Sequence, residues 1–213
     1  MASPSTAWDA IEAVRHLTEV DARLGSLMAR TGACQIRSEA KLSPYASLGR
    51  AIVYQQLSGK AAGTILGRFK QRFGRGRFPA PQAILQAGEA EMRAVGLSRN
   101  KTLALKDLAR HKLAGHVPTL SQLHAMEDDR IVERLVAIRG IGRWTVEMML
   151  IFHLGRPDVL PVDDYGVRKG FAKLYRKRRL PTPHELAHYG RRWRPYRSVA
   201  SWYLWRALEE TET

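Results

Sequence analysis

Two neighbouring carboxylates, Asp163 and Asp164, follow the stretch Leu160-Pro161-Val162 and begin a segment with helical periodicity. Near the start of a helix, the helix dipole favours an ionised carboxylate. Such a group can stabilise positive charge that develops on a reacting atom, or orient and deprotonate a water molecule. Because acidic residues also cap helices, we expect one member of the pair to be a cap. A pair of plain caps is the alternative interpretation.

A Gly-x-Gly sequence, Gly140-Ile141-Gly142, separates two other helical segments. Two glycines at this spacing allow a tight hairpin, and the second glycine opens the next helix with exposed N–H groups. Such a helix start binds phosphate, and Arg143 and Thr145 add further donors. A simple turn between helices is the competing interpretation.

The chain has 213 residues, a formal net charge of +15 and a pI near 10.5. Arg accounts for 26 of its 35 basic residues, and Arg suits bidentate contacts with phosphates and bases. Between Arg168 and Arg197 there are eleven basic residues and one acid, Glu185. This run indicates either a solvated basic face or a surface that follows phosphates. The balance of charge favours a nucleic acid partner.

A single cysteine, Cys34, excludes an internal disulfide, a four-cysteine iron–sulfur cluster and a multi-cysteine zinc site. No apolar run approaches the about 18 residues of a transmembrane helix, and no signal peptide is evident. We therefore expect an intracellular protein of a reducing compartment: cytoplasmic or nucleoid-associated if the source is bacterial, nuclear if it is eukaryotic.

Helical periodicity dominates the chain, and no alternating pattern typical of strands has a useful length. The prediction is an all-α fold of about ten helices. The first helix runs from Trp8 behind cap candidates Ser5 and Thr6. The other expected helices span 21–29, 45–73, 81–92, 98–111, 119–126, 128–138, 143–154, 164–175, 183–189 and 196–209.

Four segments, in this order, resemble the helix-hairpin-helix DNA glycosylase superfamily, in particular its 3-methyladenine DNA glycosylase II branch. They are Ile52–Ser58, Leu135–Thr145, Leu160–Tyr165 and Trp193–Ser198, the last followed by Trp202 and Trp205. The resemblance covers about residues 40–209. Arg139 departs from it, because related hairpins usually have proline there. An additional N-terminal α/β domain of the bacterial enzymes is expected to be missing.

The resemblance implies two helical lobes with the DNA and base site in the cleft. It further implies N-terminal helices over 1–40 that pack on a core of 41–213, with a helical lobe at about 45–127 and the hairpin and catalytic region at about 128–209. It assigns catalysis to Asp164 and leaves Asp163 as the cap. Trp144 stands where members that cut the strand carry a lysine, so strand cleavage is not expected.

Trp144, Met148 and Trp205 are expected to line one base pocket, where indole faces attract cationic alkylated purines. Gln56, or Leu57 as second choice, is expected to fill the gap that the flipped base leaves, although binding to the backbone is an equal alternative for Gln55 and Gln56. The predicted DNA contacts are completed by Gly140, Gly142, Arg143, Thr145 and Arg197.

No cofactor and no side-chain metal site are expected, since the histidines have no spacing typical of zinc ligands. The carbonyls of Val136, Ile138 and Ile141 are candidates for a monovalent cation by the same resemblance. The predicted function is a monofunctional glycosylase that removes alkylated bases such as 3-methyladenine and 7-methylguanine from double-stranded DNA, acting as a monomer. The alternative is a non-catalytic binder of damaged or distorted DNA, which would need neither Asp164 nor an aromatic pocket.

Overall fold

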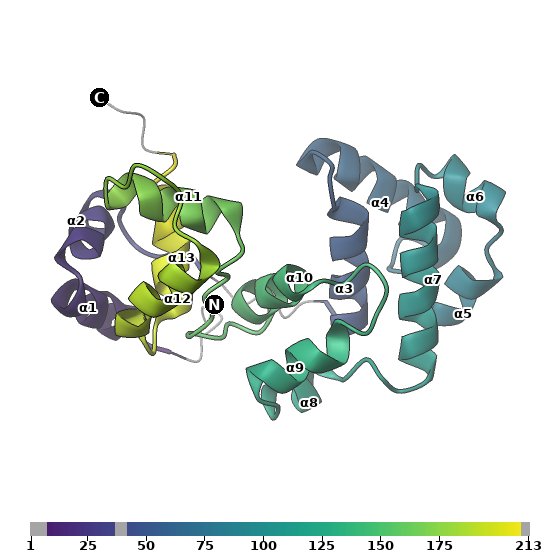
Figure 1. The fold of residues 1–213 in the computed structure, drawn as a ribbon. Helices are drawn as coiled ribbons and strands as arrows, with labels where there is room; N and C mark the ends of the chain where they lie inside the picture. Colours follow the sequence, from purple (N-terminus) through teal and green to yellow (C-terminus); the bar gives the residue numbers. More distant parts are fainter. Residues whose placement is uncertain (1–7, 37–41, 210–213) are drawn as a thin grey trace. The chain divides into compact units, whose positions relative to one another are not determined.

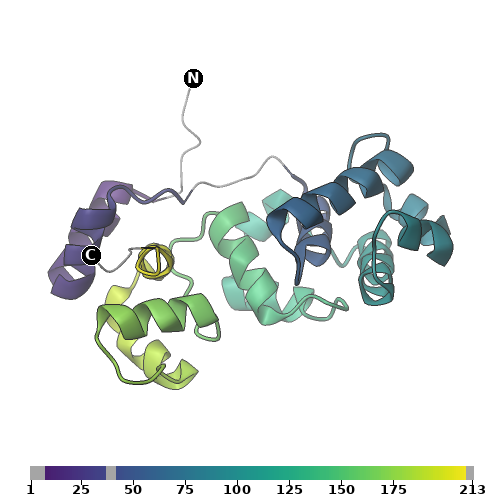
Figure 2. The same cartoon turned by 90° about the horizontal axis from the view of Figure 1, so that it is seen from above.

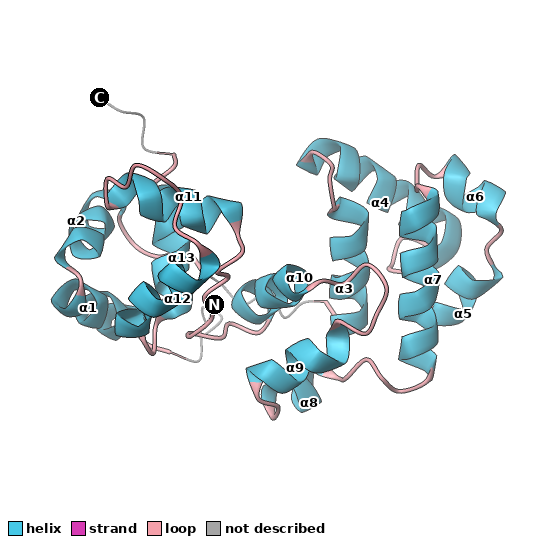
Figure 3. Cartoon of the chain, in the orientation of Figure 1, coloured by secondary structure: helices cyan, strands magenta, loops and turns pink. Residues whose placement is uncertain are grey.

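The computed structural model describes residues 8–36 and 42–209, and every regular element in these ranges is helical (Figure 3). The chain forms two compact units: a terminal unit of Met1–Glu39 and Leu150–Thr213, and a central unit of Ala40–Met149. The all-α prediction is confirmed for the described residues. In these same ranges, no helix is long and apolar enough to cross a membrane.

The central unit is built around α7, which packs against α3, α5 and α6 (Figure 1). Its apolar face is fully buried at Leu105 and Leu108, together with Ile52 of α3 and Phe69 of α4. Ser98 caps α7 by accepting the N–H of Lys101. The helices of this unit are α3 (Pro44–Tyr54), α4 (Gly59–Gly74), α5 (Pro81–Gln86), α6 (Glu89–Ala94), α7 (Arg99–Leu113), α8 (Leu120–His124), α9 (Asp128–Leu135) and α10 (Arg143–Met148).

In the terminal unit, the N-terminal helices α1 and α2 lie beside α13 (Figures 1 and 2). Asp21 joins these distant segments: only 6% exposed, it caps α2 and accepts hydrogen bonds from Tyr175, Tyr189 and Trp193 at 2.5, 3.2 and 2.9 Å. The elements of this unit are α1 (Ala10–Val20), α2 (Ala22–Thr31), α11 (Tyr165–Leu174), α12 (Pro183–Tyr189), the 3-10 helix η2 (Gly190–Trp193) and α13 (Arg197–Arg206). The π-helix η1 (Met149–His153) begins at the boundary of the units.

Three expected boundaries were wrong. The single helix over 45–73 is two helices, because the chain turns at Gln56, whose φ is 57°. The segment 81–92 is likewise divided after Gln86. The cap of α1 is Asp9, which accepts two backbone N–H groups, whereas Ser5 and Thr6 lie outside the described residues.

The division into units also differs from the expected one. The boundary lies between Met149 and Leu150 instead of near residue 127, so the hairpin belongs to the central unit. The physical reason is that contacts from α7 and from Gln55 hold the hairpin in this unit. The N-terminal helices pack with the C-terminal part of the chain because of the Asp21 network.

Candidate active site and DNA-binding elements

Asp164 occupies the N-cap position of α11, where its Oδ1 accepts the backbone N–H of Val167 at 2.7 Å. The same oxygen accepts the indole N–H of Trp205, from α13, at 2.8 Å. Two donors on one oxygen fix the rotation of the carboxylate. The ring of Trp205 is in turn stacked on Phe152 of η1, with centroids 5.7 Å apart. The carboxylate is therefore held in a defined orientation by the backbone of α11 and by a packed aromatic side chain.

Two glycines of α11 allow α13 to come close enough for this contact. A Cβ atom at Gly166 would lie 2.8 Å from Cδ1 of Trp205, and one at Gly170 only 1.9 Å from the carbonyl oxygen of Leu204. Spaced four residues apart, both glycines lie on one face of the helix. Neither glycine was predicted to contribute to the site, although the Gly-x-x-x-Gly spacing inside a helix was a signal for close packing.

The expectation that Asp163 is the cap was wrong. Asp164 is the cap, and Asp163 is exposed. The reason is that the helix begins at Tyr165, one residue later than the pattern predicted, so the second acid stands at the N-cap position. A single carboxylate, that of Asp164, therefore both caps the helix and accepts the indole N–H of Trp205.

The Gly-x-Gly segment forms a tight hairpin between α9 and α10. Gly140 has a φ of +79°, which favours glycine, and Gly142 is the N-cap of α10. The hairpin is closed by the N–H of Ile141, which donates to the carbonyl of Ile138 at 3.0 Å. The first intrahelical bond of α10 runs from Val146 to Gly142, so the preceding N–H groups lie at the helix start that favours anions. The cation site at the Val136, Ile138 and Ile141 carbonyls stays a prediction.

Arg143 lies on α10 beside two carboxylates. Its Nε donates to the buried Glu147 at 3.0 Å, and its guanidinium is 3.9 Å from Asp129. Because its side chain is still 58% exposed, it remains accessible to a phosphate. Thr145, in contrast, is only 7% exposed, and its role as a donor to DNA stays a prediction.

The segment between α3 and α4 carries the residues expected to enter the base stack. Gln56 is exposed and adopts a φ of 57°, and Leu57 is 39% exposed. Gln55 instead donates its amide N–H to the carbonyl of Gly140 at 2.8 Å. Binding to the backbone, which the sequence left open for both glutamines, is therefore what Gln55 does.

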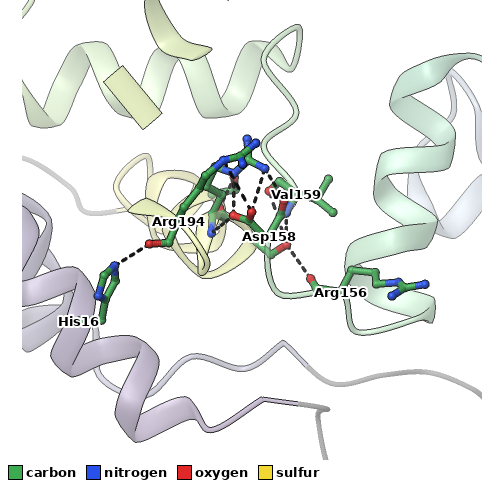
Figure 4. A network of polar contacts seen from close by, with 8 residues as sticks. His16, Arg156, Asp158, Val159 and Arg194 are labelled. Carbon is green, nitrogen blue, oxygen red and sulfur yellow. Dashed lines mark hydrogen bonds and ion pairs between the residues drawn. The ribbon is translucent and has the colours of Figure 1, made fainter. Parts of the chain in front are cut away.

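Arg197 was expected to contact DNA, but its guanidinium is bound to Asp158. Nε donates to Oδ1 of Asp158 at 2.6 Å, and Nη2 donates to Oδ2 and to the backbone carbonyl at 3.0 and 2.9 Å. Figure 4 shows Asp158 in this polar network, with Arg194 nearby, whose carbonyl accepts a bond from His16 at 2.7 Å. The geometry of Arg197 is that of a structural ion pair that joins the start of α13 to the segment between η1 and α11.

The remaining basic residues of the run from 168 to 197 differ in their surroundings. Arg179 pairs with Glu185 at 2.6 Å, and Arg168 donates to the carbonyl of Pro181. A basic loop after α11 is more open: its members are exposed and have no acidic partner in the described part of the chain. This loop consists of Arg176, Lys177 and Arg178.

Trp144 is 47% exposed on α10, and Met148 is half-buried on the same helix. Trp144 is thus not a core residue. Both belong to the central unit, whereas Asp164 and Trp205 belong to the terminal unit, and their membership in one pocket stays a prediction. Within the described ranges, no three His, Cys, Asp or Glu side chains gather as metal ligands.

Residues 50–195 match the family described as HhH-GPD superfamily base excision DNA repair protein. The chain is 42% identical over 170 residues to DNA-3-methyladenine glycosylase 1 of Schizosaccharomyces pombe, covering 80% of this chain and 75% of the relative. A solved structure of a 3-methyladenine DNA glycosylase of that yeast, in complex with abasic DNA, superimposes with a TM-score of 0.80 at 38% identity, over 92% of this chain and 95% of the other. A DNA-3-methyladenine glycosidase from Bacillus halodurans gives 0.82 at 33% identity, over 97% and 92%.

Proposed function

This chain belongs to the HhH-GPD superfamily of base excision DNA repair proteins, and from this membership we propose that it is a DNA glycosylase for alkylated bases. It flips a base such as 3-methyladenine or 7-methylguanine out of double-stranded DNA and hydrolyses the N-glycosidic bond. The observation that carries the proposal is the Asp164 carboxylate, whose Oδ1 is held by the backbone of α11 and by Trp205. Asp164 and α11 lie inside the matched residues 50–195, and Trp205 follows them.

In this proposal Asp164 acts on the sugar. As the bond between base and sugar breaks, positive charge develops on the sugar, and a nearby carboxylate lowers the energy of that state. The same carboxylate orients the attacking water and takes its proton. Since both donors hold Oδ1, the orientation of Oδ2 is already determined before the substrate binds.

We infer that the reaction stops at an abasic site. A strand-cleaving member needs an amine that forms a Schiff base, and an exposed tryptophan, Trp144, stands at that position after the hairpin. Borohydride treatment during turnover is expected to trap no covalent complex between protein and DNA. A trapped complex would contradict this part of the proposal and identify another nucleophile.

The start of α10, with Arg143 beside it, is proposed to bind DNA phosphates, and the basic loop of Arg176, Lys177 and Arg178 to extend this contact. The logarithm of affinity should then fall with the logarithm of salt by about 0.9 per neutralised phosphate. Changing both Arg176 and Arg178 to Glu should reduce this slope. The ion-paired Arg179 offers a matched control when single neutralising changes are compared: Arg178→Gln should reduce the slope, and Arg179→Gln should reduce it less.

The experiment that tests the function is base release from methylated duplex DNA, with the released bases identified by chromatography. Asp164→Asn should lose excision while it still binds duplex DNA with an abasic-site analogue, because the phosphate contacts remain. The neighbouring, exposed Asp163→Asn is the matched control and should keep most of the activity. Wild-type protein that binds the analogue but releases no base would favour the alternative, a non-catalytic binder of damaged DNA. The proposed monomeric state is checked by sedimentation of the free protein and of its DNA complex.

A further inference from the structure

One face of α7 contacts the hairpin before α10, whose helix start is proposed to bind phosphates, and the end of α3, which leads into the Gln56 segment predicted to enter the base stack. Lys101 donates to the carbonyl of Val53, in the last turn of α3, at 2.7 Å. Asp107 accepts the backbone N–H of Arg139, at the hairpin tip, at 2.9 Å. Between them lies Ala104, whose Cβ is 3.0 Å from where a side chain on Gly140 would begin. Positions 101, 104 and 107 are three residues apart and so share one side of the helix.

The bond between Asp107 and Arg139 restricts the hairpin at the position where related hairpins usually have proline. Proline fixes its own φ and has no N–H to donate. In this chain the residue is Arg139, whose N–H is available, and a side chain of α7 accepts it. The carboxylate of Asp107 is itself held near Arg110 and His111, at 3.8 and 3.7 Å. The hydrogen bond to Asp107 of α7 thus restricts the backbone at Arg139, as a proline ring would at this position.

Gln55 supplies the second link. Its amide donates to the carbonyl of Gly140 at 2.8 Å, which ties the segment after α3 directly to the hairpin tip. The next residue, Gln56, is exposed and has a φ of 57°, so its direction depends on how Gln55 is held. Burial lowers the pKa of Lys101, as expected for an ammonium group that is partly removed from water to reach the end of α3.

We propose that Asp107 and Gln55 are positioning residues, which hold the hairpin tip and the Gln56 segment in one fixed register for DNA. The hairpin then meets the phosphate backbone while Gln56 or Leu57 enters the space left by the flipped base. The inference rests on the proposed function, since it assigns these two segments to one DNA-binding event. It adds that their mutual placement is set by α7 and Gln55, which themselves need not touch DNA.

The first test compares Asp107→Ala, Asp107→Asn and the double variant Asp107→Ala with Arg139→Pro. Asp107→Ala should weaken binding to duplex DNA with an abasic-site analogue by about tenfold, the effect of one hydrogen bond to a charged group. Asp107→Asn keeps an acceptor oxygen and should bind nearly as wild type does. The double variant should recover most of the affinity, because proline restricts the tip without an N–H.

Charge alone predicts the opposite result for Asp107→Ala, since removing a carboxylate favours a polyanion. Glu133→Ala is the matched control: it removes an exposed carboxylate of α9, whose ion pair with Arg130 lies on that helix, and should not weaken binding. All affinities are measured where circular dichroism shows each variant folded. The exchange of the Arg139 amide with deuterium, measured without DNA, should be faster in Asp107→Ala than in wild type.

The second test uses Gln55→Met, which keeps the length of the side chain but cannot donate to Gly140. It should lower the preference for abasic-analogue DNA over undamaged duplex by several fold, since only the former requires the Gln56 segment in place. Asp107→Ala should weaken both affinities, because the hairpin contacts both kinds of DNA. A purely structural role would lower both affinities equally in both variants.

Wild-type affinity in Asp107→Ala, or unchanged exchange of the Arg139 amide, would overturn the proposal while base release by the wild-type protein keeps the proposed function intact. Failure of the wild-type protein both to bind damaged DNA and to release a base from it would overturn the proposed function and this inference together. Recovery by Arg139→Pro supports the positioning role, and an absence of recovery despite a folded double variant contradicts it.

Discussion

Replacing Trp205 by Phe separates two possible roles of this side chain: orienting Asp164 through its N–H, and attracting a cationic base through its ring face. The substitution keeps an aromatic ring near Phe152 but removes the indole N–H, which donates to Asp164 at 2.8 Å. A hydrogen bond to a charged group contributes about 1.5–3 kcal/mol. Because each 1.36 kcal/mol corresponds to a tenfold change in rate, losing the orientation of Asp164 should slow the chemical step by about ten- to a hundredfold.

The assay is single-turnover base release with excess protein, on duplexes that carry either 7-methylguanine, which is cationic, or hypoxanthine, which is neutral. If the N–H orients Asp164, both rates fall by a similar factor. If Trp205 acts chiefly through its electron-rich face, the rate for the cationic base falls more, because cation–π attraction requires charge. Trp202→Phe, a change of the same size on the same helix, is the control.

Unchanged rates for Trp205→Phe on both substrates would refute the argument that this hydrogen bond sets the orientation of Asp164. A loss in Trp202→Phe as large as that in Trp205→Phe would refute it as well, because general damage to α13 would then explain both.

Three further predictions follow from particular contacts. Gly166→Ala places a Cβ atom 2.8 Å from Cδ1 of Trp205, so the rate of base release should fall by about tenfold, while the free energy of unfolding in urea should change by less than about 1 kcal/mol. Full activity would contradict the claim that Gly166 allows Trp205 to reach Asp164. Asp21→Ala leaves the buried donors of Tyr175 and Trp193 and the half-buried Tyr189 without their acceptor and should lower the free energy of unfolding by about 3 kcal/mol, and a loss under about 1 kcal/mol would show that the network is not required. Burial raises the pKa of Cys34 to about 11, so alkylation of the native thiol near pH 8 should be about a hundredfold slower than in urea, with equal rates as the contrary result. Since this pKa is higher in the folded state, the associated stabilisation is present below the unfolded pKa and is lost as the pH rises toward about 11.

Local signals in the sequence predicted the elements that depend on a few adjacent residues. The acidic pair does contain the cap of α11, at Asp164 instead of the expected Asp163, and Gly140 adopts the positive φ that the hairpin requires. The break at Gln56 was missed although the sequence marks it: Gln55 and Gln56 interrupt the apolar pattern, and Ser58, which caps α4, precedes Gly59. What closes this segment is the bond from Gln55 to a carbonyl 85 residues away, and no local pattern reports such a contact.

The role of each arginine was equally inaccessible to composition. A count of basic residues places Arg197 and Arg178 in one run. The guanidinium of Arg197, however, donates three hydrogen bonds to Asp158, whereas Arg178 is exposed. The pairing depends on a carboxylate 39 residues earlier in the chain, which the fold brings to the start of α13. For the same reason, one acid in the run, Glu185, neutralises Arg179 and leaves its neighbours open.

These contacts change how the net charge of +15 bears on DNA binding. Charge held in close ion pairs inside a unit adds little to the release of counterions, because the carboxylate already compensates it. Among the predicted DNA contacts, Arg143 shares its carboxylates but stays exposed, and in the described part of the run from 168 to 197 the basic loop after α11 is exposed without an acidic partner. We therefore expect the salt dependence of DNA binding to come more from these positions than from Arg168, Arg179 and Arg197, which contact residues of the unit that carries Asp164. The orientation of the proposed catalytic carboxylate does not depend on the basic residues. Hydrogen bonds from the Val167 N–H and the Trp205 indole hold Asp164, and neither donor carries a charge.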